Sequence, residues 1–522
     1  MSYSSAKWIS PKNTFSWWYV DNTVNLFLAD KFSPYLRNAR LDWESITIRP
    51  GHQLFATLTA WSYPKGIWSY LRTVETNDRL VVRHNTDATH KLYSITEAWV
   101  ATSITTAWNI TWDGRMSFVN IWDVIYCFNG ADDFGKLDWT TYTVPSSWIA
   151  WAFVRFWVVF NGCLWISWAD IFPNKVYKSV ADDYEDMSWA WSDDFTFQET
   201  ITWLSANLQA LFYFTKNTIS VTWVSDITDT AWTITYTNRS LAVKEWAVNH
   251  ASIVETWSRT YYLTPSNKIN MIMRWTDVDW YEALELSERK YQWISKIMST
   301  LDNDQTDSFG YFLPKDNLIK WFVKTQWATF NDLCIVYDLS KDAFLVDGQK
   351  FFYWWVNFKN KNYTISMIEE KVYQDEINQD DEDVLIPFEY RTKEFYITDP
   401  TYKKILRETR TLVDINELAE LKQTLFADWW LIDTKQIDKD NVKIFRDWIW
   451  TLPIGTFAIW MPTQTLDEYQ ETYILRTKWN LNTLWKKFQF RFINNSLAWK
   501  VRLKNISMKI EQKPWLATDL TT

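Results

Sequence analysis

Residues 152–180 read AFVRFWVVFNGCLWISWADIFPNKVYKSV, and this stretch decides the fold class of the chain. It predicts three short strands joined by tight turns: Ala152–Phe156, Val158–Ile166 with a break near Asn161-Gly162, and Lys175–Val180. Alternating apolar residues, enrichment in β-branched and aromatic side chains, and an Asn-Gly turn are typical of an antiparallel β-meander.

Similar meanders recur along the middle of the chain. They lie at residues 79–96, 115–144, 203–223, 246–272, 321–346 and 351–376. With the first stretch these are about seven units of uneven spacing, which indicates a β-propeller with insertions. We therefore predict an all-β protein: a six- or seven-bladed β-propeller with an N-terminal extension, one inserted helix and a C-terminal β-sandwich-like domain.

One insertion in the propeller is expected to be helical, and the domain boundaries follow from changes in composition. We predict a helix in the insertion near 287–301, where Ser287 can cap a segment whose apolar residues share one face. Those residues are Ile294, Ile297, Met298 and Leu301. The expected units are an N-terminal extension and hairpin (1–78), the propeller (79–374), an acidic solvated linker (375–383), the β-sandwich (384–512) and a tail (513–522).

Composition excludes several classes of protein. The chain has 522 residues, a net charge of -9 and a sequence pI near 5.2, which does not favour a nucleic-acid-binding surface. No apolar run reaches the ~20 residues of a membrane span, and the N-terminus lacks the apolar core of a secretory signal. Cys127, Cys163 and Cys334 are widely spaced, so we expect small buried side chains in strands and no disulfide.

Glycine and tryptophan occur in abnormal numbers. The chain has 9 Gly and 39 Trp, whereas about 7% Gly, roughly 37 residues here, is typical. A β-rich chain needs turn glycines, and tryptophan is a poor substitute because its Cβ disfavours left-handed backbone conformations. We predict that most of these tryptophans are glycines of a genome that reads UGA as glycine. The suspected positions are Trp17, Trp18, Trp43, Trp139, Trp157, Trp165, Trp168, Trp280, Trp429, Trp448 and Trp499.

The alternative is a protein that is genuinely rich in tryptophan, such as a carbohydrate binder with stacking platforms. Binding platforms would gather on one face, whereas these tryptophans are scattered at turn-like positions such as Asp42-Trp43 and Asp138-Trp139. Genuine Asp-Gly and Asn-Gly turns at Asp347-Gly348 and Asn129-Gly130 have the same context. In the opening stretch, Trp157 and its neighbouring tryptophans are therefore expected at turns and bulges.

A search for catalytic and ligand-binding motifs finds none. The four histidines lack metal-ligand spacing, and no phosphate-binding loop or nucleophile motif is present even when every Trp is read as Gly. The acidic run at 182–194 clusters in one loop, whereas propeller glycosidases need a pair of carboxylates across a pocket. The run at 375–383 matches no calcium-loop spacing. We expect no enzyme activity, no cofactor and no metal.

The N-terminal segment carries a family pattern. With Trp17 and Trp18 read as glycine, it has a Gly-Gly start followed by Asn-x-Arg and Arg-Pro-Gly, formed by Asn38, Arg40, Arg49, Pro50 and Gly51. This pattern resembles the opening of propeller-type virion proteins of short-tailed phages. The blade patterns, residues 201–221, and FEYRTKEF…KKILRE (388–408) extend the resemblance. We expect the five motif residues to shape a turn and to pair locally.

The resemblance implies a structural subunit of the head–tail connector or tail nozzle. Such a subunit is expected to be assembled in the host cytoplasm into the virion and to form a homo-oligomeric ring. It would contact portal, adaptor and other tail proteins, and double-stranded DNA would pass through without sequence-specific binding. The alternative function is a glycan-binding or glycan-cleaving propeller of a tail or secreted protein.

Overall fold

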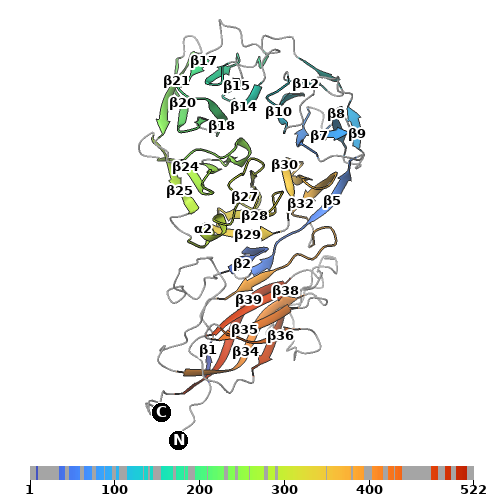
Figure 1. The fold of residues 1–522 in the computed structure, drawn as a ribbon, viewed down its shortest axis with the longest axis vertical. Helices are drawn as coiled ribbons and strands as arrows, with labels where there is room; N and C mark the ends of the chain where they lie inside the picture. The colour runs from blue at the N-terminus through green and yellow to red at the C-terminus, as the bar shows by residue number, and fades with distance from the viewer. Residues whose placement is uncertain are drawn as a thin grey trace, which may run out of the picture.

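The fold is taken from a computed structural model of residues 1–522 (Figure 1). It describes residues 7–9, 35–41, 46–392 with short gaps, 403–415, 421–427, 430–437, 472–479, 488–494 and 501–513. The gaps within 46–392 are 59–63, 73–77, 87–88, 97–100, 105–114, 133–134, 139–140, 145–153, 169–171, 181–182, 186–193, 208–209, 229–232, 242–244, 258, 276–279, 288–291, 349 and 378–379.

Seven four-stranded antiparallel units surround one axis in the described part of the chain (Figure 1). We number them blades 1 to 7 in chain order. Blade 1 is β6 (Gly66–Tyr70), β7 (Arg79–Thr86), β8 (Thr89–Ile95) and β9 (Ala101–Ile104); blade 2 is β10 (Ser117–Ile121), β11 (Val124–Phe128), β12 (Gly135–Asp138) and β13 (Thr141–Thr143); blade 3 is β14 (Val154–Phe160), β15 (Cys163–Trp168), β16 (Lys175–Lys178) and β17 (Asp194–Thr196). The β-propeller prediction is confirmed, and the blade number is seven.

For the remaining blades, as for blades 1 to 3, the strands are given in order from the axis outward. Blade 4 is β18 (Ile201–Ala206), β19 (Leu211–Thr215), β20 (Ile219–Thr228) and β21 (Thr233–Leu241); blade 5 is β22 (Val254–Glu255), β23 (Arg259–Leu263), β24 (Ile269–Trp275) and β25 (Trp280–Glu285). Blade 6 is β26 (Phe309–Leu313), β27 (Leu318–Val323), β28 (Leu333–Asp338) and β29 (Ala343–Gly348); blade 7 has β30 (Phe352–Phe358), β31 (Lys361–Ser366) and β32 (Lys371–Asp375). A 3-10 turn, η4 (His250–Ser252), precedes β22.

An N-terminal strand closes the ring. β5 (His52–Thr57) pairs antiparallel with β32 and so supplies the outer strand of blade 7. This pairing joins the first and last parts of the propeller, and it removes an unpaired strand edge. The propeller therefore begins at His52, and the predicted boundary at residue 79 is wrong, because β5 and β6 already belong to blades 7 and 1.

The opening stretch forms blade 3 with a different strand division from the one predicted. β14 and β15 meet at the two-residue turn Asn161-Gly162, where both residues have positive φ (51° and 71°). The first strand runs unbroken through Trp157, which pairs with Ile166. Trp157 is thus a paired strand residue and not a turn.

Neighbouring blades pack face to face through apolar side chains. Between blades 3 and 4 the cluster includes Phe156, Leu204, Leu211 and the fully buried Trp165. The three cysteines are buried in strands, as predicted, and are not joined in disulfides. Burial raises the pKa of Cys334 to about 12, which keeps its thiol protonated.

The C-terminal strands form a second domain of two packed sheets, which confirms the sandwich prediction. One sheet has the order β3-β4-β39-β34-β37 with β1 beside β39; its strands are β1 (Lys7–Ile9), β3 (Ala39–Leu41), β4 (Ile46–Ile48), β34 (Lys403–Ile415), β37 (Thr472–Lys478) and β39 (Val501–Lys513). The facing sheet contains β33 (Glu389–Arg391), β35 (Leu421–Ala427), β36 (Trp430–Ile437) and β38 (Phe488–Asn494). Alternate residues of β38 are buried, as expected for a strand with one face on the core.

The two domains share a continuous sheet. β2 (Tyr35–Arg37) pairs parallel with β29 of blade 6 and antiparallel with β33 of the sandwich. Blade 6 thereby continues through β2 into the sandwich as one nine-stranded sheet, and Figure 1 shows β2 between the two domains.

The predicted helix lies between blades 5 and 6. α2 covers Gln292–Met298, with Ile294, Met298 and the following Leu301 buried in the large core cluster. The Ser287 hydroxyl accepts a hydrogen bond from the N–H of Ile269. Within the described residues, no helix is long and apolar enough to cross a membrane.

The tryptophans of the described residues differ in backbone conformation. Trp122 and Trp327 have positive φ (57° and 78°) and are 74% and 99% exposed. These are conditions under which glycine is favoured, although neither residue was singled out from the sequence. The suspected positions Trp157, Trp165, Trp168 and Trp280 lie in strands, so their expected placement in turns or bulges is wrong. Those outside the described residues are Trp17, Trp18, Trp43, Trp139, Trp429, Trp448 and Trp499.

The turn position Trp122 allows a direct test of glycine preference. We expect Trp122→Gly to raise the free energy of unfolding by about 1 kcal/mol, because glycine adopts positive φ without the Cβ penalty. Trp430 is the matched control: it is 71% exposed but lies in strand β36 with no positive φ. Trp430→Gly should lower stability by about 0.5–1 kcal/mol. Urea unfolding of both variants measures this, and equal effects would contradict it.

Candidate functional site

The five motif residues lie where the propeller meets the sandwich. Asn38 is fully buried between β2 and β3 with φ 53°. Its side-chain amide donates to the carbonyl of Pro387 (2.7 Å), and its Oδ1 accepts from the N–H of Gly348 (2.9 Å). One side chain thus links the N-terminal segment, blade 6 and the sandwich.

Arg49 is the next member of this group. Its Nε donates to Asn38 Oδ1 (3.1 Å), and its guanidinium forms a two-pronged ion pair with Asp381, in which Nη1 lies 3.0 Å from Oδ1. Arg49 is 1% exposed. His52 Nδ1 lies 2.8 Å from Asp381 Oδ1. Planar bidentate pairing of this kind fixes both position and orientation.

Pro50 and Gly51 complete the motif by backbone geometry. The Pro50 carbonyl accepts a hydrogen bond from Arg49 Nη1 (3.0 Å). A Cβ on Gly51 would lie 1.7 Å from the carbonyl oxygen of Asp380. Gly51 is therefore required because the acidic segment passes directly over it.

Arg40 forms a second bidentate pair. Its Nη1 and Nη2 donate to the two carboxylate oxygens of Asp347 at 2.9 and 2.8 Å, and Nη2 also lies 3.1 Å from Glu376 Oε1. Burial alone would raise the pKa of Asp347, but the Arg40 guanidinium outweighs it and holds that pKa below its usual value.

Two buried lysines share the acidic segment. Asp375 accepts from Lys350 Nζ (2.6 Å), Lys320 Nζ (3.0 Å) and the Tyr311 hydroxyl (3.0 Å). Lys320 also pairs with Glu376. Burial favours the neutral form of Asp375, but the Lys320 and Lys350 ammonium groups hold its pKa well below the usual value.

Together these groups form a charge-balanced network that we call the joint. Its cations are Arg40, Arg49, Lys320 and Lys350, and its anions are Asp347, Asp375, Glu376 and Asp381. All eight are largely removed from solvent, so each charge needs a partner. The prediction of a solvated acidic linker at 375–383 is wrong for Asp375, Glu376 and Asp381, whose carboxylates are held in buried ion pairs. The motif residues do pair locally, through Arg49 with Asn38 and Pro50. Arg40 and Arg49 in addition bind carboxylates that lie more than 300 residues away in sequence.

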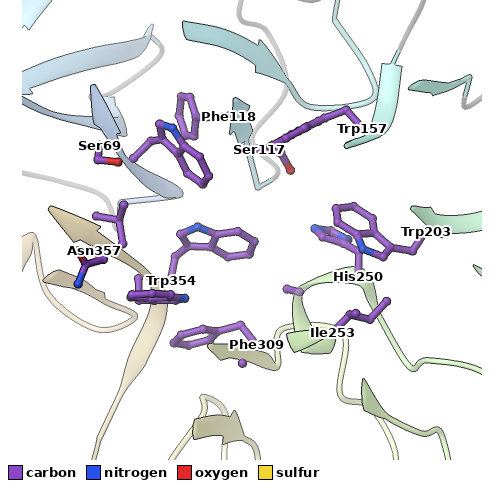
Figure 2. A pocket seen from close by; sticks show the side chains of 15 residues that line it. Ser69, Ser117, Phe118, Trp157, Trp203, His250, Ile253, Phe309, Trp354 and Asn357 are labelled. Carbon is purple, nitrogen blue, oxygen red and sulfur yellow. The ribbon is translucent and has the colours of Figure 1, made fainter. Parts of the chain in front are cut away.

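The propeller axis contains a cavity of about 350 Å³, lined by residues of six blades and by the segment with η4 that precedes β22 of blade 5. Its wall is largely aromatic, and the labelled rings in Figure 2 surround one common space. Trp203 stacks on His250 with ring centroids 4.3 Å apart, and Trp68 meets Trp157 edge-on at 6.2 Å. Arg115 lies over the Trp354 ring at 4.7 Å.

A groove of about 610 Å³ lies at the turns that end the inner strands of blades 3 to 6. Glu255 lines it, and its Oε1 accepts from the Ser205 hydroxyl (2.5 Å) and the Ala206 N–H (2.8 Å). Although Glu255 is an exposed residue, surrounding protein atoms raise its pKa to about 7, while the bonds from Ser205 and Ala206 act in the opposite direction. Glu255 is the single carboxylate among the described residues lining the groove and the axial cavity.

The acidic stretch 182–194 is divided between structural roles where it is described. Glu185 accepts from the Tyr126 hydroxyl (2.8 Å) and pairs with Lys136 (2.5 Å), and Asp194 begins β17. Asp182, Asp186 and Asp193 lie outside the described residues. No group of three or more potential metal ligands is found among the residues that the structure describes.

No protein-family model and no curated protein matches the chain. Among solved structures, PorZ, a bacterial surface component of the type-IX secretion system of Porphyromonas gingivalis, is 10% identical with a TM-score of 0.37. The match covers 74% of this chain and 46% of PorZ, so the chain spans less than half of that protein. YCF48 bound to a D1 peptide is also 10% identical at TM-score 0.37, covering 65% of this chain and 97% of that one.

Removing one anion tests the joint. We expect Asp375→Asn to lower the free energy of unfolding by about 3–5 kcal/mol, because it leaves buried lysine charge uncompensated. The control is Lys268→Met, which breaks the more exposed pair with Glu285 (3.1 Å) and should cost less than about 1 kcal/mol. Urea unfolding of both variants gives the comparison, and similar losses would refute the special role of the joint.

The joint also predicts the pH dependence of stability. The pKa values of Asp347, Asp375 and Asp381 are lowered in the folded protein by their buried cationic partners. Their stabilising contribution is therefore complete above the unfolded pKa of about 3.9 and is lost as the pH falls below it. We expect the contribution of these three aspartates to the unfolding free energy to be constant from pH 7 to 5 and to decline below about pH 4. Asp381→Asn should make that decline less steep, and an unchanged slope would contradict the assignment.

Proposed function

We propose that the chain is a structural subunit of a phage virion, in the head–tail connector or tail nozzle. One observation carries the proposal: of the five residues through which the sequence resembles phage virion propeller proteins, Arg40 and Arg49 belong to the joint, and Asn38, Pro50 and Gly51 lie directly beside it. Asn38, Arg40 and Arg49 make its polar contacts, and Gly51 allows the acidic segment to approach. The motif residues therefore have a structural role, which fits a subunit of an assembly better than an enzyme.

A rigid connection between two domains suits a ring-forming subunit. The nine-stranded sheet and the buried ion network hold the propeller and sandwich in one relative orientation. If both domains contact neighbours, that fixed orientation keeps the contact surfaces aligned in every copy, which a closed ring requires.

The charge of the chain fits passage of DNA without retention. At a net charge of -9 the subunit repels phosphates on average. A ring of such subunits would enclose the DNA exit channel and bind portal, adaptor and tail proteins through other surfaces. Its place is the virion, after assembly in the host cytoplasm.

The oligomeric state tests this function. We expect sedimentation velocity of the purified full chain to show a closed ring, alone or with the portal protein of the same phage. Double-stranded DNA should not be retained at physiological salt, because the phosphate attraction that drives non-specific binding is missing. A protein that stays monomeric both alone and with portal and tail partners would refute the proposal.

The axial cavity favours a second function, binding of a glycan. Aromatic faces such as Trp203 and Trp157 stack on sugar rings, and indole N–H groups can donate to hydroxyls. The cavity of about 350 Å³ is large enough for a small ligand. This function requires tryptophan at the lining positions.

A further inference from the structure

The residues that line the axial cavity include one at a similar position in the inner strand of six blades and, at blade 5, Ile253 directly before β22. Each lies two or three positions before the last residue of the inner strand that pairs with the second strand. From blade 1 to blade 7 the residues are Trp68, Phe118, Trp157, Trp203, Ile253, Gly310 and Trp355. We call these seven residues the axial ring. Four of the seven are tryptophan.

Blade 6 shows what glycine does at this position. A Cβ on Gly310 would lie 2.6 Å from both Trp321 Cδ1 and Val254 Cγ2. The absence of a side chain lets the fully buried Trp321 fill the space between blades 5 and 6. Strands β26 and β27 pair without a register shift. Glycine at the axial ring is therefore compatible with a regular, well-packed blade.

Three of the four inner strands that carry tryptophan at the axial ring are less regular, whereas β6, which carries Trp68, pairs without a register shift. Register shifts occur between Val154 and Phe156, between Ile201 and Trp203, and between Phe352 and Trp354. These shifts lie next to Trp157, Trp203 and Trp355. Irregular positions in a strand, and positions of close approach, are typical sites for glycine.

The tryptophans of the axial ring differ from those of the core in their hydrogen bonding. The indole N–H groups of Trp68 and Trp157 are buried and have no acceptor among the described residues. In contrast, the fully buried Trp165 donates to the Phe160 carbonyl (3.1 Å) and Trp321 to the Ser252 carbonyl (3.0 Å). A buried N–H without an acceptor costs free energy. Trp68 and Trp157 are thus poorly matched to their sites, whereas the core tryptophans are well matched, and we therefore interpret Trp165 as a genuine tryptophan and not as one of the suspected glycines.

We propose that residues 68, 157, 203 and 355 are glycine in the protein made by its own translation system, in which UGA encodes glycine, and that the propeller axis is consequently an open channel. The shape of the channel then depends on the genetic code used for translation. Glycine at these positions also removes the aromatic platform that glycan binding requires. This inference does not depend on the role in the virion.

The residue identities are tested by peptide mass spectrometry of the protein purified from its native source. We expect glycine at positions 68, 157, 203 and 355. Tryptophan at any of the four positions overturns the proposal. Assembly of the same sample into a closed oligomeric ring is measured separately. Failure of this inference can therefore be distinguished from failure of the proposed virion role.

Two recombinant forms test the open channel. One is the chain as written, and the other carries Trp68→Gly, Trp157→Gly, Trp203→Gly and Trp355→Gly. Each also carries Ser117→Cys, because Ser117 lines the cavity and is buried, while the natural cysteines are all buried. We expect a maleimide to modify Cys at position 117 severalfold faster in the four-glycine form. Equal rates in the two folded proteins overturn the open channel.

A third form controls for the general effect on folding of replacing tryptophan with glycine. It carries Trp165→Gly and Trp321→Gly, which remove core side chains whose N–H groups are bonded. We expect this form to unfold at a much lower temperature than the chain as written, because large cavities remain. The four-glycine form should keep a cooperative transition; its failure to fold, while the chain as written folds, overturns the proposal.

Discussion

The charge balance of the joint is the constraint on which the rest of the structure depends. Arg40, Arg49, Lys320 and Lys350 cannot be buried singly, so Asp347, Asp375, Glu376 and Asp381 must lie beside them. The requirement brings together the N-terminal hairpin, blade 6 and the segment after blade 7. It therefore sets the position of β5 at the propeller edge and of β2 between the domains.

Closure of the propeller and attachment of the sandwich are consequences of one chain path. The N-terminal segment passes through β2, β3 and β4 in the sandwich and joint before it enters blade 7 as β5. The N-terminal segment is thus held both by strand pairing and by the ion network. The connection is stiff because relative rotation of the domains would break both backbone pairing and buried charge pairs.

Much of the fold could be predicted from local pattern. The Asn161-Gly162 turn, the alternation in β38 and the apolar face of α2 are local signals, and the structure contains all three elements. The joint could not be predicted in this way. Its motif residues were recognised, but their partners Asp347 and Asp381 lie far along the chain, and a single sequence carries no signal that links them.

The sequence by itself determined the all-β propeller with a C-terminal sandwich, the helix and the excess of tryptophan over glycine, because periodicity and composition are properties of neighbouring residues. Only the tertiary structure decided the blade number, the closure by β5 and the burial of Asp375 and Asp381. A run of carboxylates is a solvated surface or a buried network according to which cations the fold places beside it. That depends on long-range geometry, which local pattern does not contain.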